Sequence, residues 1–168
     1  MTDGPTAGEI LEWERRLAPV LFNHTWELLD TPERTPAQDA AMLSATFAQR
    51  HLWYQVGTPR NRAIADWQVA RVAAVLGLAE IADRFGRVSL AICDEHELDP
   101  FYRGYAHEAI ARAADVMGDT QTRNQHVLAA RELARLVVDA EERQMLSSDV
   151  EMMVEADDGS ARPNQPLA

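Results

Sequence analysis

The chain has 168 residues, of which 46% are hydrophobic and 26% charged, and its formal net charge is −11. This composition is typical of a globular protein, and the length is enough for one domain with a hydrophobic core. Because so negative a protein repels phosphate backbones and anionic lipids, we expect neither nucleic acid nor a membrane surface among its partners.

The two polar ends of the chain are predicted to be disordered and to flank one helical domain. The predicted N-terminal segment covers residues 1–7, the domain covers residues 8–154, and the tail covers residues 155–168. The tail is polar and contains glycine and two prolines, which is typical of disorder. The one cysteine, Cys93, excludes an intrachain disulfide. No signal-peptide pattern is present either, so we expect a cytoplasmic protein.

Apolar residues recur at helical spacing from near the N-terminus onward. The first helix is predicted over residues 8–30, and Pro19 inside it predicts a kink or a break. The second helix, residues 36–56, follows a capping box in which Thr35 is the N-cap and Gln38 stands three residues later. Proline occupies its first position, where the missing N–H group costs nothing.

Five further helices follow, and no alternating run typical of a strand interrupts them. Thr58 and Pro59 repeat the start signal of the second helix, and glycines end the third and fifth helices. The predicted ranges are 59–76, 78–97, 101–117, 120–138 and 140–154. Short connections favour antiparallel neighbours. The sequence therefore predicts an all-α fold of about seven helices stacked as antiparallel helical hairpins.

The middle of the chain contains an internal repeat. Gly77 and Gly118 are 118 − 77 = 41 residues apart, and the helices before them match at this offset. The matched residues are Ala65, Ala70, Arg71, Ala73 and Val75 with Ala106, Ala111, Arg112, Ala114 and Val116. The helices after the glycines match only in character.

The repeat resembles the tetratricopeptide repeat (TPR), in which a large-small residue pair, a glycine turn and small residues in the second helix let paired helices cross closely. The matching residues are Val69-Ala70 and Ile110-Ala111 for the pair, Gly77 and Gly118 for the turn, and Ala82, Ser89 and Ala130 for the small positions. Three features depart from the family: Arg123 stands where alanine is usual, the proline that usually closes the unit is absent at the matching place, and the period of 41 exceeds the family's length of about 34. The resemblance implies a helical superhelix that binds proteins or peptides and catalyses no reaction.

In the TPR family, the first helices of successive units form a concave surface that binds extended peptides. Carried over by the alignment, this groove contains Trp67, Arg71, Tyr105, Glu108, Arg112 and Asp115. Arg71 and Arg112 occupy equivalent places, so two exposed guanidinium groups could clamp a carboxylate of the partner. The alternative is a purely solvated helix face, on which Glu108 and Arg112 form a surface ion pair.

Catalytic and metal-binding arrangements find little support in the sequence. His107 and Glu108 are adjacent on one helix and point about 100° apart, so they are not expected to form a dyad. The five histidines have no metal-binding spacing. We therefore expect no metal and no cofactor.

A second hypothesis is a small-molecule-binding or enzymatic helical bundle, in which Trp53, Tyr54 and Trp67 form the wall of a pocket. A third is self-association as a homodimer, because a short repeat array leaves apolar ends that need to be covered.

Overall fold

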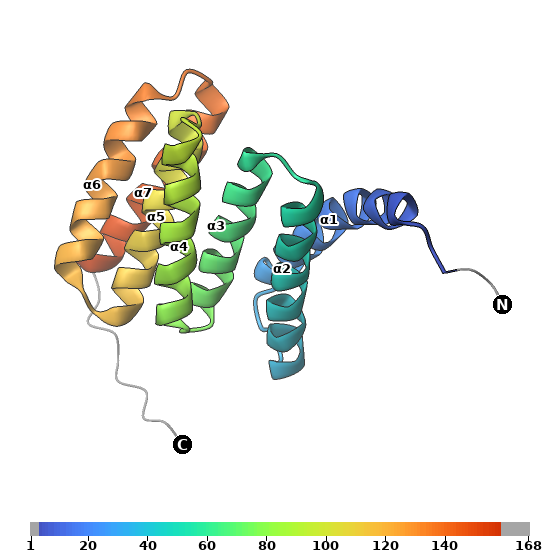
Figure 1. Ribbon diagram of the computed structural model, residues 1–168. Helices are drawn as coiled ribbons and strands as arrows, with labels where there is room; N and C mark the ends of the chain where they lie inside the picture. Colours follow the sequence, from blue (N-terminus) through green and yellow to red (C-terminus); the bar gives the residue numbers. More distant parts are fainter. Residues whose placement is uncertain (1–3, 159–168) are drawn as a thin grey trace.

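The computed structural model describes residues 4–158, which form seven helices and no strand. Figure 1 shows them in chain order as a stack of hairpins. The helices are α1 (Ala7–Leu29), α2 (Pro36–Val56), α3 (Pro59–Val75), α4 (Ala79–Glu95), α5 (Pro100–Met117), α6 (Thr120–Leu136) and α7 (Ala140–Asp158). The predicted all-α hairpin architecture is confirmed. Helix α7 continues past residue 154, where the tail was expected to begin, and residues 159–168 and 1–3 lie outside the described residues.

The helix starts follow from the capping residues. Thr35 accepts a hydrogen bond from the Gln38 backbone N–H, and the Gln38 side chain accepts one from the Thr35 backbone. Thr58 and Asn61 form the same reciprocal pair at the start of α3. Each pair satisfies N–H groups that a helix start leaves without an intrahelical acceptor.

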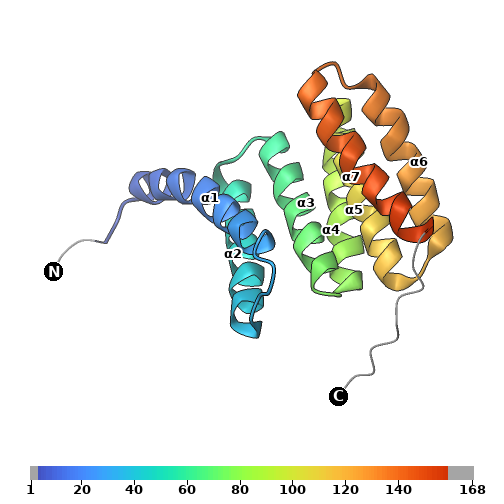
Figure 2. The same ribbon diagram turned by 180° about the vertical axis from the view of Figure 1, so that it is seen from behind.

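Pro19 does not break the first helix. Helix α1 runs through it, and Figure 2 shows that the helix bends along its length. A proline in a helix interior removes one backbone hydrogen bond and crowds the preceding turn, which bends a helix without ending it. The expected kink is present, and the alternative of two separate helices is wrong.

The helices pack mainly against their neighbours in the chain. Helix pairs α1–α2, α3–α4 and α5–α6 form hairpins, α3 also packs on α5, and α5 packs on α7. Figure 2, turned by 180° from Figure 1, shows α1 and α7 in front of α2 and α6. The side of the stack formed by α1, α3, α5 and α7 is called the first-helix side below.

The two glycine turns are equivalent. Gly77 and Gly118 both have positive φ, +72° and +74°. The N–H of Leu78 donates to the Ala73 carbonyl over 2.8 Å, and the N–H of Asp119 donates to the Ala114 carbonyl over 2.9 Å. These bonds are the helix-ending arrangement that a left-handed glycine permits. Donors and acceptors in the two turns keep the 41-residue offset, so the prediction that the glycines occupy matching turns is confirmed.

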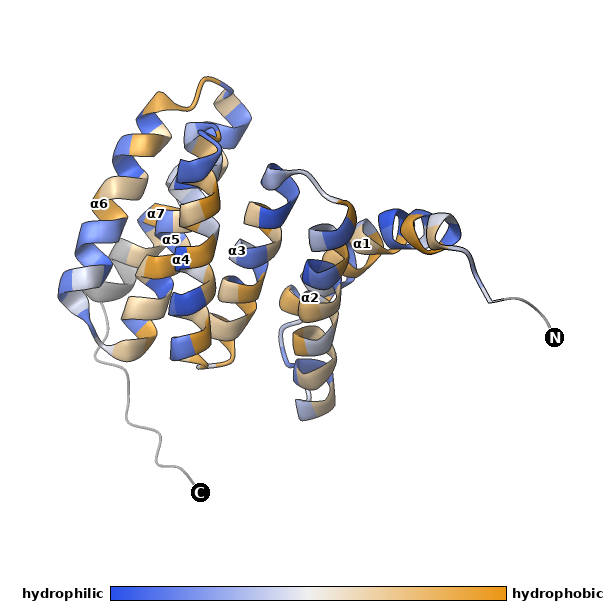
Figure 3. Ribbon diagram, in the orientation of Figure 1, coloured by the Kyte–Doolittle hydropathy of each residue, from blue (hydrophilic) through white to orange (hydrophobic). Residues whose placement is uncertain are grey.

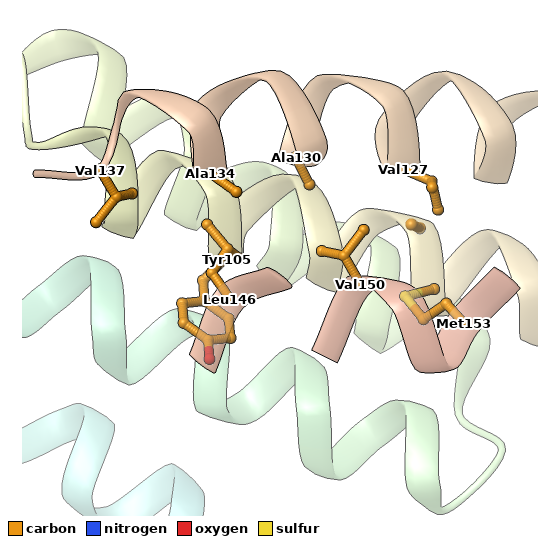
Figure 4. Packing of buried hydrophobic residues seen from close by; sticks show 9 residues of the cluster. Tyr105, Val127, Ala130, Ala134, Val137, Leu146, Val150 and Met153 are labelled. Atoms are coloured by element: carbon orange, nitrogen blue, oxygen red, sulfur yellow. The ribbon is translucent and has the colours of Figure 1, made fainter. Parts of the chain in front are cut away.

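Helix α7 covers the C-terminal end of the stack. Its Leu146, Val150 and Met153 are buried against α5 and α6, as Figure 4 shows. Gly104 in α5 permits the close approach of α7, because a Cβ atom there would clash with Leu146 Cδ2. Figure 3 shows polar and apolar residues mixed along the helices. None of the helices in residues 4–158 is long and apolar enough to cross a membrane.

Candidate binding site on the first helices

A cavity of about 450 Å³ opens on the first-helix side. Helices α1, α3, α5 and α7 form most of its wall, and α4 contributes Ser89. We call it the aromatic pocket because half of its lining residues are aromatic. The lining residues are Phe22, Trp26, Ala63, Ile64, Trp67, Arg71, Ser89, Phe101, Tyr102, Tyr105, Met145 and Asp149. Its volume lies within the range of cavities that hold small molecules or large side chains.

The rings of the aromatic pocket pack against one another across helix boundaries. Trp67 of α3 lies between Trp26 of α1 and Tyr105 of α5, with ring centroids 5.6 Å and 5.0 Å away. Phe101 meets Tyr105 edge to face at 5.0 Å. Such contacts stabilise each ring by about 0.5–1.5 kcal/mol beyond area burial. The pocket wall is therefore formed by mutually supported rings.

A fully buried carboxylate lies beneath the pocket wall. Glu108 accepts hydrogen bonds from Trp67 Nε1 at 3.2 Å and from Arg71 Nη1 at 2.9 Å, and it also accepts one from Arg112 Nε. We call these four residues the Glu108 cluster. A buried carboxylate must be paired and hydrogen-bonded. Its donors come from both α3 and α5, so the cluster joins these two helices.

The Glu108 cluster corrects two expectations from the sequence. Glu108 and Arg112 are not a solvated surface pair, since the carboxylate is fully buried. Arg71 and Arg112 are not largely exposed either: their side chains are 19% and 23% accessible, and both bind Glu108. The two guanidinium groups expected to clamp a partner's carboxylate thus bind a carboxylate of the chain itself.

Five of the six predicted groove residues divide between two cavities. Trp67, Arg71 and Tyr105 line the aromatic pocket. Arg71 also borders a second hollow of about 400 Å³, which contains Arg112 and Asp115. The other residues of this second hollow are Ala74, Val75, Val116, Met152 and Met153. Asp115 Oδ1 lies 3.6 Å from Nη1 of Arg123 in α6. Glu108 lines neither cavity.

Helix α7 contributes a polar group that sequence reasoning missed. The Tyr105 hydroxyl donates to Asp149 Oδ2 over 2.9 Å. Burial and then the nearby Asp149 carboxylate raise the pKa of Tyr105 well above its usual value. Figure 4 shows the ring with its hydroxyl oxygen directed away from α6. Tyr105 is therefore held as a neutral hydrogen-bond donor at the pocket wall.

The repeat itself contained the signal for two missed residues. The 41-residue step that joins Trp67 to Glu108 leads back to Trp26 (67 − 26 = 41) and forward to Asp149 (149 − 108 = 41). Trp26 and Asp149 both line the aromatic pocket. Extending the repeat by one unit at each end would have found both.

Trp53 and Tyr54, expected to share a pocket with Trp67, lie outside the aromatic pocket that Trp67 lines. The Tyr54 hydroxyl donates to the buried Asp66, which also accepts from Arg50 Nε at 2.5 Å. Burial and the Asp66 hydrogen bond raise the pKa of Tyr54 to about 12, and burial raises the pKa of Asp66. Asp66 precedes Trp67 in α3, and adjacent helical residues point in different directions. Neither Trp53 nor Tyr54 lines the aromatic pocket.

Two histidines that are far apart in the sequence meet between α5 and α6. His107 Nδ1 and His126 Nδ1 are 2.9 Å apart. Burial lowers the pKa of His126, while burial and then His126 lower the pKa of His107 to about 4. No group of three or more His, Cys, Asp or Glu side chains suited to a metal ion occurs in the described part of the chain.

Comparison of the chain with family models, with curated proteins and with solved structures finds no match.

Proposed function

We propose that the protein is a non-catalytic, TPR-like module that binds a protein or peptide along its first-helix side. The aromatic pocket carries this proposal, because a cavity lined mainly by the four helices of the first-helix side is open to an extended chain. The two equivalent glycine turns and the 41-residue offset of the flanking hydrogen bonds support the TPR-like repeat.

The rigidity of the pocket also supports a binding role. Trp67 is held by Glu108, Tyr105 by Asp149, and both rings by their neighbours. A preformed site avoids much of the ordering cost that weakens binding. Partly exposed tryptophan, tyrosine and arginine are also the residues that most often anchor an interface.

The chemistry of the pocket favours binding over catalysis. A general acid or base works best when its pKa is near the working pH. The pKa of Tyr105 is shifted away from neutrality, and Arg71 is engaged by Glu108. The polar groups thus serve to orient a ligand.

The test is selection of peptides from a random display library on the purified protein, followed by calorimetric titration of the selected peptides. Trp26→Ala removes a pocket wall and should weaken binding by about tenfold or more, as expected for an aromatic anchor. Trp13→Ala is the matched control, because Trp13 is an exposed tryptophan of the same helix outside the pocket. Equal affinities of wild type and Trp26→Ala would place the interface elsewhere, and failure to select any peptide would contradict the proposal.

A further inference from the structure

Asp149 supplies a carboxylate to the wall of the aromatic pocket. No arginine of the described residues forms an ion pair with this carboxylate. Its Oδ2 accepts a hydrogen bond from the Tyr105 hydroxyl, and among the residues that the structure describes no ion pair involves Asp149. The other charge in the pocket wall, Arg71, is bound to Glu108. The pocket therefore presents an anionic oxygen beside aromatic rings, while its cationic group already has a partner.

The ring faces are suited to a positive charge. Aromatic faces carry partial negative charge, and a cation within about 6 Å of a ring centroid is attracted to it. Arginines occupy such positions in this protein: Arg50 Cζ lies 4.1 Å from the Tyr54 ring centroid, and Arg60 Cζ lies 6.0 Å from the ring centroid of Tyr102, which lines the pocket. In the described part of the chain, no arginine is stacked on Trp26, Trp67, Phe101 or Tyr105.

We propose that the aromatic pocket binds the basic side chain of a peptide, a lysine or an arginine, with the cationic group at Asp149 and the apolar stem along the rings. This inference rests on the proposed peptide-binding function and names the chemistry of the partner. The stem gains apolar contact in the 450 Å³ cavity. The charge gains a carboxylate and ring faces away from bulk water, where both interactions strengthen. The net charge of −11 draws basic segments toward the protein.

The experiment uses three peptide pools that are identical except for one fixed central residue: lysine, norleucine or glutamate. Norleucine has the same stem as lysine without the ammonium group, and glutamate tests binding of an acid at the Glu108 cluster, where two guanidinium groups share one carboxylate. Calorimetry with the wild-type protein should give about tenfold tighter binding for the lysine pool than for either other pool, as expected for a partly desolvated cation on aromatic faces.

Asp149→Asn tests the role of the carboxylate. Asparagine keeps an acceptor for Tyr105 and nearly the same volume, so the fold should not change, and the lysine pool should lose more affinity than the norleucine pool. The preference for lysine should fall to about threefold or less, because only the ring faces remain to attract the charge. Glu151→Gln is the control, since it removes the same charge from the same helix outside the aromatic pocket.

The outcomes separate this inference from the proposed function. Equal or tighter binding of the norleucine or glutamate pool, or an unchanged preference in Asp149→Asn, overturns the inference while peptide binding stands. If no pool binds but n-butylammonium binds in an Asp149-dependent way, the cation site stands and the peptide-binding function fails. If neither peptides nor n-butylammonium bind, both fail.

Discussion

Glu108 is the residue on which the first-helix side most depends. Its carboxylate is fully buried and accepts hydrogen bonds from Trp67 and Arg71 of α3 and from Arg112 of α5. One side chain thus fixes a ring of the aromatic pocket, the distance between two neighbouring helices and the orientation of two arginines. For this reason a double Arg71→Ala, Arg112→Ala change would disturb the fold as well as the surface, contrary to what exposed arginines would allow.

Replacement of Glu108 should destabilise the protein strongly. Glu108→Ala leaves two guanidinium groups without a counter-charge, and breaking a buried pair from one side typically costs about 3–5 kcal/mol. Urea unfolding followed by circular dichroism measures the loss. The control is Glu132→Ala, which breaks the exposed pair with Arg135 and should cost about 1 kcal/mol or less. Similar losses in the two variants would show that the Glu108 cluster contributes no more than a surface pair.

The pair of His107 and His126 makes stability depend on pH. Burial and His126 lower the pKa of His107 to about 4 in the folded protein from an ordinary 6.5. Between these values the unfolded chain binds more protons, so the contribution of His107 is complete above about pH 6.5 and is lost as the pH falls toward about 4.

Unfolding free energies of wild type and His107→Gln between pH 8 and pH 4.5 check this dependence. The advantage of wild type over the variant should shrink as the pH falls below about 6.5, where the unfolded histidine takes up its proton. It should stay constant between pH 7.5 and pH 8, which is the internal control. A constant difference over the whole range would mean that His107 is not held neutral.

At the scale of elements, two of the hairpins, α3–α4 and α5–α6, turn at glycines with left-handed backbone. Neither Gly77 nor Gly118 has an atom within 4 Å of an added Cβ, so substitution costs only the backbone conformation. Gly77→Ala and Gly118→Ala should each lower the free energy of unfolding by a similar amount, about 1–2 kcal/mol.

Thermal or urea unfolding of the two variants gives this comparison directly. Gly8→Ala is the matched control: Gly8 also has open space around it, but its φ is not positive, and it lies in a helix where alanine is favoured. That variant should keep or slightly gain stability. A cost at only one of Gly77 and Gly118 would argue against equivalent turns.

At the scale of the whole molecule, burial is unevenly distributed along the stack. Most residues in the second halves of both α3 and α5 are buried, whereas α1 has no buried residue before Ala18. In a stack where each helix contacts mainly its neighbours, stability is roughly a sum of local interfaces. The N-terminal half of α1 has almost no such interface.

Hydrogen exchange should therefore be graded along the chain. Amides in α3 and α5 should exchange slowest and amides in residues 8–16 fastest among the helices, because exchange follows local opening and opening follows the number of buried contacts. Mass spectrometry of peptic fragments measures the gradient, with α4 as an intermediate reference. Equal protection of residues 8–16 and α5 would show that α1 is covered, as by self-association into the homodimer considered above.

The sequence by itself determined the number of helices, their capped starts, the glycine turns and the pairing of adjacent helices, whereas the predicted C-terminal ends of α6 and α7 differ from the observed ones. Capping residues such as Thr35 and Thr58 and the left-handed Gly77 and Gly118 act within one turn of the chain, so local chemistry is enough to predict them. Short connections then leave adjacent helices little choice but to pack side by side.

Only the tertiary structure decided which side chains meet. The burial of Glu108, the meeting of His107 with His126, and the contribution of Asp149 to the aromatic pocket join residues from different helices. Helical periodicity gives the face on which a residue lies, but it does not give the neighbour that covers that face. For a charged residue such as Glu108 the same pattern fits a solvated surface and a paired interior, and the packing of α3 on α5 chooses between them.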